Sequence, residues 1–458
     1  MGKKRDLFTC IIFFACLLFY GFFAVFDGAV ICADSPSYIN MQSSREPLYP
    51  VLLALFRGIF QKFQDGVYLD AVAFFQSILM AVAVFILEEY LRKEIQVSKV
   101  SSVLIFLMPV AVSLLCRFAA RRGSMYSNSI LTEGIAIPLY LLFFRFLAEY
   151  LISNTKRSLC WCLVLSFFMI STRKQMLFAF AMLIAAIIYV ACRKKKAGYG
   201  ILTIFISVVL VLGGNAVFDV GYNYMVRGEK TTHSSDIRFI ATVAFYTAER
   251  EDAARIEEPD IRELFLDIYD TCEEEGYLGH SAVGGWRGRV SHFGDYYDRI
   301  QIDTMWPKTN HYVQEHFTCS KAQISKYEDE VMGEISKAVI PLHAGRVIRI
   351  FWDNFLAGLV LTVAQYHPVL IFYSVIVYVL YLAMFILVWK MGKEKNVLIF
   401  AAAVFLAVVF NVGLVSLVIF CQTRYTIYNM ALFYIALIVM GDFLLRKTFR
   451  GSGIKRRR

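Results

Sequence analysis

Charged residues are scarce in this chain, and long uncharged runs take their place. Asp, Glu, Lys and Arg together make up 18% of the 458 residues, whereas hydrophobic residues make up 58%. Several runs approach the roughly 20 apolar residues that a helix needs to cross the hydrocarbon core of a bilayer. A soluble globular protein is therefore excluded. Short segments of alternating hydrophobicity, which are typical of a membrane β-barrel, are also lacking. We expect an all-α polytopic membrane protein.

The ten cysteines lack the spacing of a metal or redox centre. Most lie in apolar runs, where cysteine behaves as a small core residue, and Cys160 and Cys162 are too close together for a zinc site. Cys272 and Cys319 lie in a polar region, and the sequence leaves open whether they pair. Ligand spacing is also missing from the histidines of that region, which are His233, His280, His292, His311, His316 and His343. No cofactor is expected, and no pattern supports a divalent metal.

Charge is unevenly distributed along the chain. Residues 220–350 hold 15 Lys and Arg against 22 Asp and Glu, a net charge of −7, whereas the remainder carries +17. The basic residues flank apolar runs, which indicates membrane topology and excludes a nucleic-acid surface. Basic groups at residues 3–5, 193–196 and 455–458 predict that both termini are cytoplasmic and that residues 220–350 are extracytoplasmic. Short basic turns favour a bacterial plasma membrane.

The apolar runs predict about ten transmembrane helices. They lie at residues 7–26, 67–91, 100–116, 135–151, 159–170, 177–192, 201–218, 368–389, 397–419 and 427–445. Residues 48–60 form a shorter run, which Arg57 interrupts, and we expect a helix that lies in the membrane interface.

Four segments follow from this pattern. Residues 1–219 form an N-terminal membrane module, whose first outer loop is 27–66. Residues 220–350 form a polar insert, 351–445 the C-terminal transmembrane helices, and 446–458 a basic tail. The insert should be mainly helical. Pro259 suits the start of a helix that Gly276 ends, and Ser320 suits the cap of a helix that runs through Val331.

Residues 34–50, beyond the first apolar run, concentrate polar chemistry at the mouth of the bundle. Placing charged side chains at a membrane costs free energy, so such residues commonly mark a functional site. Asp34 and Arg45 either hydrate an outer loop or form a carboxylate base beside an anion-binding arginine. The three prolines of the stretch indicate defined turns.

Three other places on the same face carry charge. Arg173 and Lys174 suit a lipid phosphate, because the guanidinium fork matches two phosphate oxygens. Glu133 is explained equally well by the dipole of the helix that it begins. Arg424 and Tyr425 are explained equally well as an interfacial anchor. The charged residues that the topology gathers on the outer face are Asp34, Arg45, Arg121, Arg122, Glu133, Arg173, Lys174 and Arg424.

The order of these segments resembles the GT-C superfamily, whose members are integral-membrane glycosyltransferases that use polyprenyl-phosphate sugars. The group includes protein O-mannosyltransferases and the lipid A aminoarabinose transferase. The matching segments are residues 34–38 with 45–50 (first outer loop), 131–133 leading into 137–141, 171–175 (an arginine-containing hairpin) and 424–425 (the start of the last span). The resemblance covers roughly residues 1–220 and 366–445. Members often carry Asp-Glu in the first loop, whereas here Ser35 follows Asp34, which argues against a paired-carboxylate metal site.

The resemblance implies an inverting transfer of a sugar from a polyprenyl-phosphate donor to an extracytoplasmic acceptor, which is a cell-envelope glycan, a lipid or a protein. Asp34 would be the general base. Donor phosphate would be held by Arg45, Arg173, Lys174 and Arg424, with support from Tyr38, Tyr49, Glu133 and Tyr425. Membrane lipids are the other expected partners.

Two alternatives stay open. A transporter or flippase of lipid-linked sugars would need cations along a path through the bundle, where Arg145 is the main charge, and halves with matching broken helices. A non-enzymatic membrane component would use the insert to bind a partner, and its outer-loop charges would be dispensable.

Overall fold

The computed structural model describes residues 6–60, 62, 66–118, 125–234, 236–320, 323–391 and 394–451. Helices make up the regular secondary structure of these residues, and nine of the helices are long and apolar enough to cross a membrane. The chain is an all-α polytopic membrane protein, as predicted. Arg121, Arg122 and the end of the basic tail at 452–458 lie outside the described residues.

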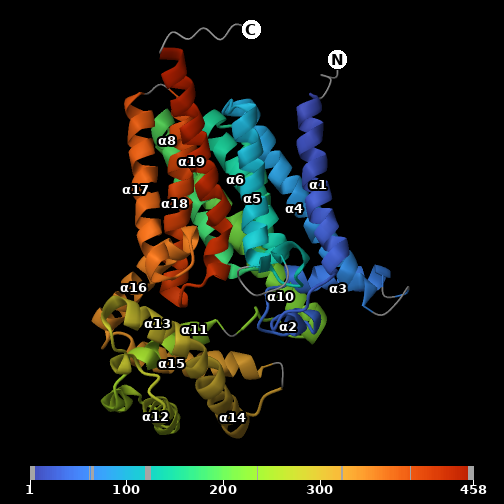
Figure 1. Cartoon of the computed structure of the whole chain (residues 1–458). Coiled ribbons are helices and arrows are strands. Elements are labelled where there is room, and N and C mark those ends of the chain that lie inside the picture. Colours follow the sequence, from blue (N-terminus) through green and yellow to red (C-terminus); the bar gives the residue numbers. More distant parts are fainter. Residues whose placement is uncertain are drawn as a thin grey trace.

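The nine helices stand side by side in one bundle (Figure 1). Their bounds are α1 Leu7–Asp27, α4 Val67–Glu94, α5 Lys99–Phe118, α6 Glu133–Ser153, α8 Leu177–Lys194, the continuous α9 Ala197–Val208 with α10 Gly214–Arg227, α17 Pro368–Lys390, α18 Lys395–Val418 and α19 Thr423–Gly451. The crossing predicted at 159–170 is α7 Lys156–Thr172, which packs against α6 but has only 17 residues. The described part of the chain therefore has nine helices of spanning length, against about ten predicted.

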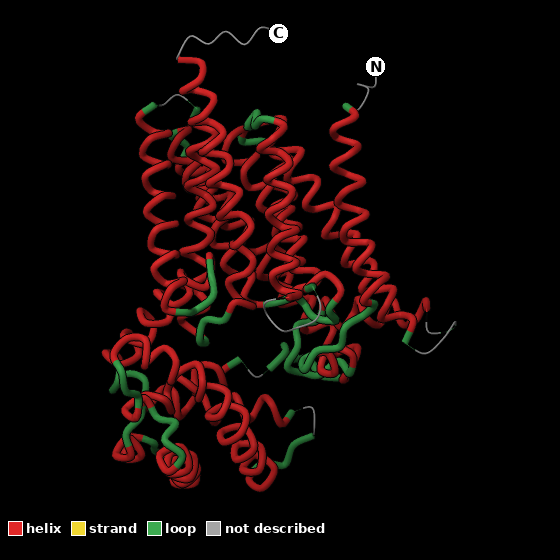
Figure 2. The backbone as a smooth tube through the Cα atoms, viewed as in Figure 1, coloured by secondary structure: helices red, strands yellow, loops and turns green. Residues whose placement is uncertain are grey.

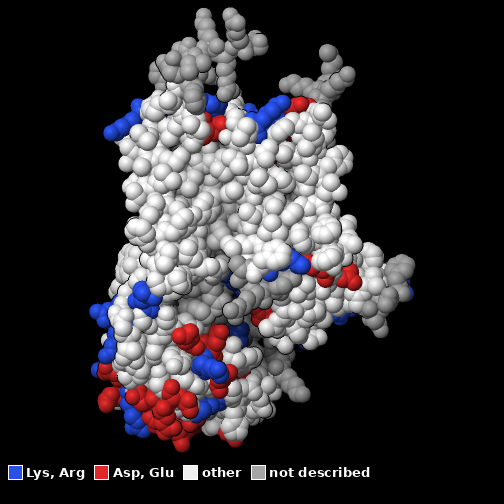
Figure 3. Space-filling model, in the orientation of Figure 1, with Lys and Arg blue, Asp and Glu red and all other residues white. Residues whose placement is uncertain are grey.

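The bundle has two different ends. Helix α1 begins and α19 ends at one of them, whereas the polar insert covers the other, which we call the insert end (Figures 1 and 2). Between the ends, the visible surface is an almost uncharged band, and Lys, Arg, Asp and Glu gather above and below it (Figure 3). A band of this kind suits burial in a hydrocarbon core, where charged side chains are costly.

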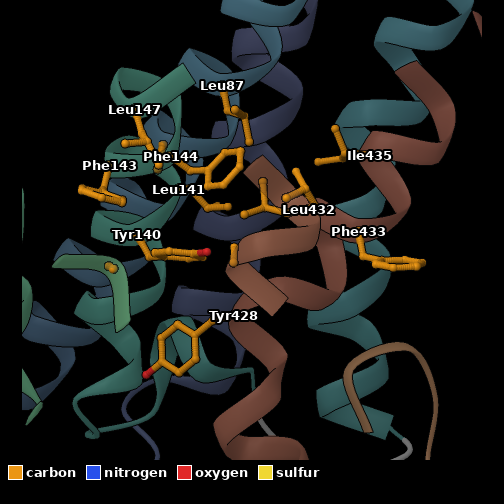
Figure 4. Packing of buried hydrophobic residues seen from close by; sticks show 14 of the residues in the cluster. Leu87, Tyr140, Leu141, Phe143, Phe144, Leu147, Tyr428, Leu432, Phe433 and Ile435 are labelled. Carbon is orange, nitrogen blue, oxygen red and sulfur yellow. The ribbon is translucent and has the colours of Figure 1, made fainter. Parts of the chain in front are cut away.

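Aromatic residues of α6 and aliphatic residues of α19 pack together at the centre of the bundle (Figure 4). Tyr140, Phe144 and Leu432 are fully buried there. The hydroxyl of Tyr140 donates a hydrogen bond of 2.7 Å to Asn429 Oδ1, and Asn429 Nδ2 donates one of 3.2 Å to the carbonyl of Ala407. Polar bonds therefore tie α6, α19 and α18 together inside an apolar core.

The insert has a hydrophobic core of its own, which includes Phe245, Phe265 and Tyr297. Its main helices are α11 Ile237–Thr247, α12 Pro259–Glu274, α13 Gly285–Asp298, α14 Trp306–His316 and α15 Ile324–Val339. Pro259 begins α12, and Gly276, with a φ of 71°, follows its end, as predicted.

The prediction for Ser320 is wrong. Helix α15 begins at Ile324, after Gln323, and continues past Val331 to Val339. The Ser320 hydroxyl donates instead to Glu229 Oε1 at 3.0 Å, so it does not cap the helix. Cys272 and Cys319 are free thiols, and both contribute to the apolar interior of the insert.

Both predicted boundaries of the insert fall inside helices. The boundary at 219/220 lies in α10, and the boundary at 350/351 lies in α16 Ala344–Val363. The residue composition changes at these points, but the helical backbone continues across them. In α10, the side-chain Nδ2 of Asn223 donates to Asp219 Oδ1 one turn earlier at 2.9 Å, which supports the helix beyond its apolar part. Helix α16 contacts both the insert, at α11 and α13, and the bundle, at α18 and α19, whereas α10 ends at Arg227, before the first helix of the insert core.

The Tyr140–Asn429 bond predicts a difference between two buried tyrosines of the same core. Tyr140→Phe removes a donor from Asn429 and should cost about 0.6–1.7 kcal/mol of stability, the range of buried hydrogen bonds in membrane bundles. Tyr428→Phe is the matched control, because the Tyr428 hydroxyl is buried without a hydrogen-bond partner, and it should be neutral or stabilising. Unfolding in mixed detergent micelles measures both, and equal losses would contradict the assignment.

Candidate functional site

The first loop is fixed against a segment that lies about a hundred residues later. Helix α2 Ser35–Ile39 follows Asp34, and α3 Leu48–Phe60 has the bounds predicted for the short apolar helix. Val30 forms an isolated parallel bridge with Ser129, and the Ser35 hydroxyl donates to the carbonyl of Ile130 at 2.8 Å. These bonds bring Asp34 to the start of α6, where Glu133 is the first residue.

Asp34 lies between two arginines. Arg45 Nη2 is 3.1 Å from Asp34 Oδ1, and Arg424 Nη1 is 2.5 Å from Asp34 Oδ2. The second arginine comes from the start of α19, 390 residues away in sequence. The Asp34 side chain keeps 33% of its surface exposed, so it can be reached from solvent.

Glu133 lies on the other side of Arg424. Its carboxylate pairs with Arg424 Nε and, at 2.6 Å, with Arg173 Nη1, and its side chain is 0% exposed. Burial of a carboxylate is tolerated only with good ion partners and hydrogen bonds. Helix-dipole stabilisation alone therefore does not explain this residue, since it bridges two cations. We call the connected residues Arg45, Asp34, Arg424, Glu133 and Arg173 the ion network.

The charges set the ionisation of Asp34. Burial favours its neutral form, but Arg424 and Arg45 outweigh burial and hold the pKa of Asp34 below its ordinary value. Glu133 likewise holds the pKa of the Arg173 guanidinium above its ordinary value, against the effect of burial. The network therefore consists of full charges at neutral pH, with one more arginine than carboxylates.

Three of the four residues predicted to support the site are aromatic, and all three lie against it. The Arg45 guanidinium is 4.6 Å from the centre of the Tyr38 ring, and the Arg173 guanidinium is 5.1 Å from that of Tyr425. Tyr49 packs edge-on against Tyr38, with ring centres 5.3 Å apart. Aromatic faces attract cations, so these rings restrain the guanidinium groups.

Lys174 is predicted beside Arg173 in the phosphate site, but in the structure its ammonium group forms its ion pair outside the ion network. Its ammonium group pairs with Asp236 of the insert, and its backbone N–H donates to Glu46 Oε1 at 2.8 Å. Lys174 thus links the hairpin to the insert, and it has no bond to the ion network among those of the described residues.

The sequence alone did not identify three uncharged polar residues whose hydrogen bonds hold the segments around the site in place. They are Gln76, Gln175 and Asn411. The amide of Gln76 in α4 accepts from the Tyr49 hydroxyl at 2.9 Å and donates to the carbonyl of Ser129 at 3.0 Å. Gln175 donates to Asn411 Oδ1 at 2.9 Å and to the carbonyl of Tyr425 at 2.7 Å. The available signal was polarity within or beside apolar runs, which in membrane proteins marks functional or packing positions.

An apolar cavity adjoins the network inside the bundle. It is small, since the space open to a water-sized occupant is about 30 Å³, and Glu133 belongs to its lining. The apolar lining comes from α4, α5, α6 and α19 and includes Met80, Pro109, Leu141 and Ile427. A cavity of this size has room for about two water molecules beside the network.

Metal chemistry has no visible support. No group of three or more His, Cys, Asp and Glu side chains among the described residues is arranged to hold a metal ion. The carboxylates of the network are instead neutralised by arginines.

Comparisons with protein-family models and with curated proteins find no match. The function must therefore be argued from the geometry of the chain itself.

Burial of Glu133 predicts a large stability loss on its neutralisation. Glu133→Gln keeps the size of the side chain but leaves the two arginines without its charge, so we expect about 3–5 kcal/mol of destabilisation. Glu149→Gln is the matched control on the same helix, because Glu149 pairs with Arg145 one turn away and is partly exposed. It should cost less than about 1 kcal/mol. Chemical denaturation in detergent gives both values, and a Glu133→Gln loss no larger than the control would refute the bridging role.

Proposed function

We propose that this protein is a membrane glycosyltransferase that moves a sugar from a polyprenyl-phosphate donor to an acceptor outside the cytoplasm. The observation that carries the proposal is the ion network at the insert end, with one partly exposed carboxylate among three arginines. Such a site offers one base and several anion-binding groups. The resemblance to GT-C enzymes adds the same roles for Asp34, Arg45, Arg173 and Arg424.

The donor phosphate would bind where Asp34 now lies between its arginines. Arg45 and Arg424 each donate one guanidinium N–H to the Asp34 carboxylate. A phosphodiester oxygen competes for those N–H groups, because arginine pairs with phosphate as readily as with carboxylate. Glu133 keeps Arg424 and Arg173 in place during the exchange. Donor binding would therefore free the Asp34 carboxylate for the acceptor.

The transfer then proceeds as one displacement. Asp34 takes the proton of the acceptor hydroxyl while the acceptor oxygen forms a bond to the anomeric carbon. The bond between that carbon and the phosphate oxygen breaks, and its electron pair leaves with polyprenyl phosphate. The arginines stabilise the charge that develops on the leaving phosphate, which in comparable oxyanion sites contributes about 2.7–4 kcal/mol per contact. Attack opposite the leaving group inverts the anomeric centre.

The surrounding structure suits these partners. Basic residues at the opposite end of the bundle, such as Arg193 and Lys194 at the end of α8, favour placing that end in the cytoplasm and the insert outside. The insert would cover the site, and its link through Lys174 would restrain it there.

Replacement of the proposed base provides the main test. Purified protein in detergent receives labelled polyprenyl-phosphate sugars and envelope extracts as a source of acceptors. We expect Asp34→Asn to lower transfer by about 10²–10⁴-fold, the usual contribution of a positioned base. Asp270→Asn is the control, since the Asp270 side chain is exposed on the insert and pairs with Arg250.

Three results would count against the proposal. They are wild-type transfer rates in Asp34→Asn, the absence of any transfer by the unaltered protein across the sugars tried, and movement of intact lipid-linked sugar across liposomes, which would favour the transporter.

The arginines around Asp34 also predict the pH dependence of transfer. In the free protein the pKa of Asp34 lies below its ordinary value, so kcat/KM should stay flat from pH 8 down to about pH 5. When donor phosphate draws the arginines away, the pKa of Asp34 rises, and kcat should fall at a higher pH than kcat/KM does. Rates measured at saturating and at low donor concentration separate the two profiles. Acid limbs at the same pH would show that the donor does not displace these contacts.

A further inference from the structure

A second cavity lies in the insert, and none of the ion-network residues lines it. It encloses about 750 Å³, including space open to solvent, between residues of α11, α13 and α16. The residues that matter to its chemistry are Tyr246, Arg289, Arg346, Arg349, Asp353 and Asn354. Nitrogen donors outnumber oxygen acceptors in this lining.

Two of the three arginines already have carboxylate partners. Arg289 makes a two-pronged pair with Asp353, at 2.6 and 3.0 Å. Arg346 pairs with Glu249 and donates to the carbonyl of Thr247 at 3.1 Å. Among the ion pairs of the described residues, none involves Arg349. The cavity wall therefore carries one uncompensated positive charge.

A buried donor in the same cavity also lacks a partner. Asn354 is only 3% exposed, and its Nδ2 makes no hydrogen bond. Buried polar groups are nearly always hydrogen-bonded, and an unpaired donor is costly. Less than 1 Å² of this nitrogen is accessible, so the Asn354 side chain must turn before a ligand in the cavity that it lines can supply the missing acceptor. The uncompensated charge of Arg349 points to an anion, and the unpaired donor is compatible with one.

The position of α16 narrows the class of anion. Ile348, Trp352 and Leu356 recur every fourth residue and are all exposed, so they form an apolar stripe on one side of the helix. Further along, Thr426 of α19 donates to the carbonyl of Leu361 at 2.9 Å, which anchors α16 in the bundle. Helix α16 joins the bundle to the insert (Figure 1), and Lys and Arg side chains lie along that edge of the uncharged band (Figure 3). A tryptophan near a basic residue, here Trp352 near Arg349, is typical of the level of the lipid headgroups in a membrane.

We propose that this cavity binds a phosphate group as a singly charged phosphodiester, with Arg349 as its counter-ion and Asn354 Nδ2 as a hydrogen-bond donor. The single unpaired cation matches the single negative charge of a diester. Two sources share this chemistry, the headgroup of an anionic membrane lipid and a soluble phosphate compound. The site is separate from the proposed transfer site and does not depend on that function.

Binding to the full chain in a phosphate-free maltoside detergent tests the site. One arm titrates short-chain phosphatidylglycerol and follows retained lipid by native mass spectrometry. The other arm titrates glycerophosphoglycerol, a soluble phosphodiester without acyl chains, and follows thermal stabilisation. We expect Arg349→Gln and Asn354→Leu each to raise the dissociation constant at least about tenfold, because each removes a direct bond to the anion. Arg299→Ala is the control, since this exposed arginine of the insert pairs with Asp303, away from the cavity lining.

Each outcome decides something. Binding of the lipid that the two variants weaken supports a headgroup site, and the same dependence for glycerophosphoglycerol alone supports a soluble ligand. Unaltered binding of both ligands in Arg349→Gln, which changes an exposed side chain and should fold normally, overturns the proposal. Failure of the wild-type protein to bind either ligand also overturns it. Sugar transfer is not part of these measurements, so its presence or absence leaves their result unaffected.

Discussion

The pairing of one fully buried carboxylate with two arginines organises the insert end of this protein. Glu133 begins α6, Arg173 directly follows α7, and Arg424 lies in the first turn of α19, so three distant segments converge on one charge. Water cannot stabilise Glu133, since no part of its side chain is exposed. The arginines must do so, and this requirement fixes their positions relative to the helices. Arg424 is thereby held where its remaining N–H groups reach Asp34.

This arrangement gives the two carboxylates different roles. Glu133 is inaccessible and holds cations, whereas Asp34 is partly exposed and, in the proposed function, would share its cations with the donor phosphate. An arginine that is already oriented loses little conformational freedom when it binds a ligand, which favours tight binding of phosphate. The same contacts keep Asp34 ionised but weakly basic until they are exchanged. Binding and proton transfer would thus be coupled through the guanidinium groups.

The insert is part of the same construction. Helix α16 contacts both the bundle and the insert, and the Lys174–Asp236 pair adds a link beside the ion network. These two links restrain the insert relative to the bundle. Helix α16 also lines the arginine-rich cavity, which therefore lies where the insert meets the bundle. The insert therefore presents one face to the ion network and a separate anion-binding cavity at its edge.

The local sequence determined the helices, because the length of an apolar run, the charges that flank it and the residues that start or stop a helix all act over a few residues. Pro259 and Gly276 are examples of such start and stop residues. The exact extent of α3 and the gathering of Asp34, Glu133, Arg173 and Arg424 at one end could be predicted in this way. Only the tertiary structure decided that Glu133 bridges two arginines and that Lys174 turns to Asp236. The physical reason is distance along the chain. Contacts between residues up to 390 positions apart depend on how the helices pack, and neither hydrophobic periodicity nor charge spacing contains that information.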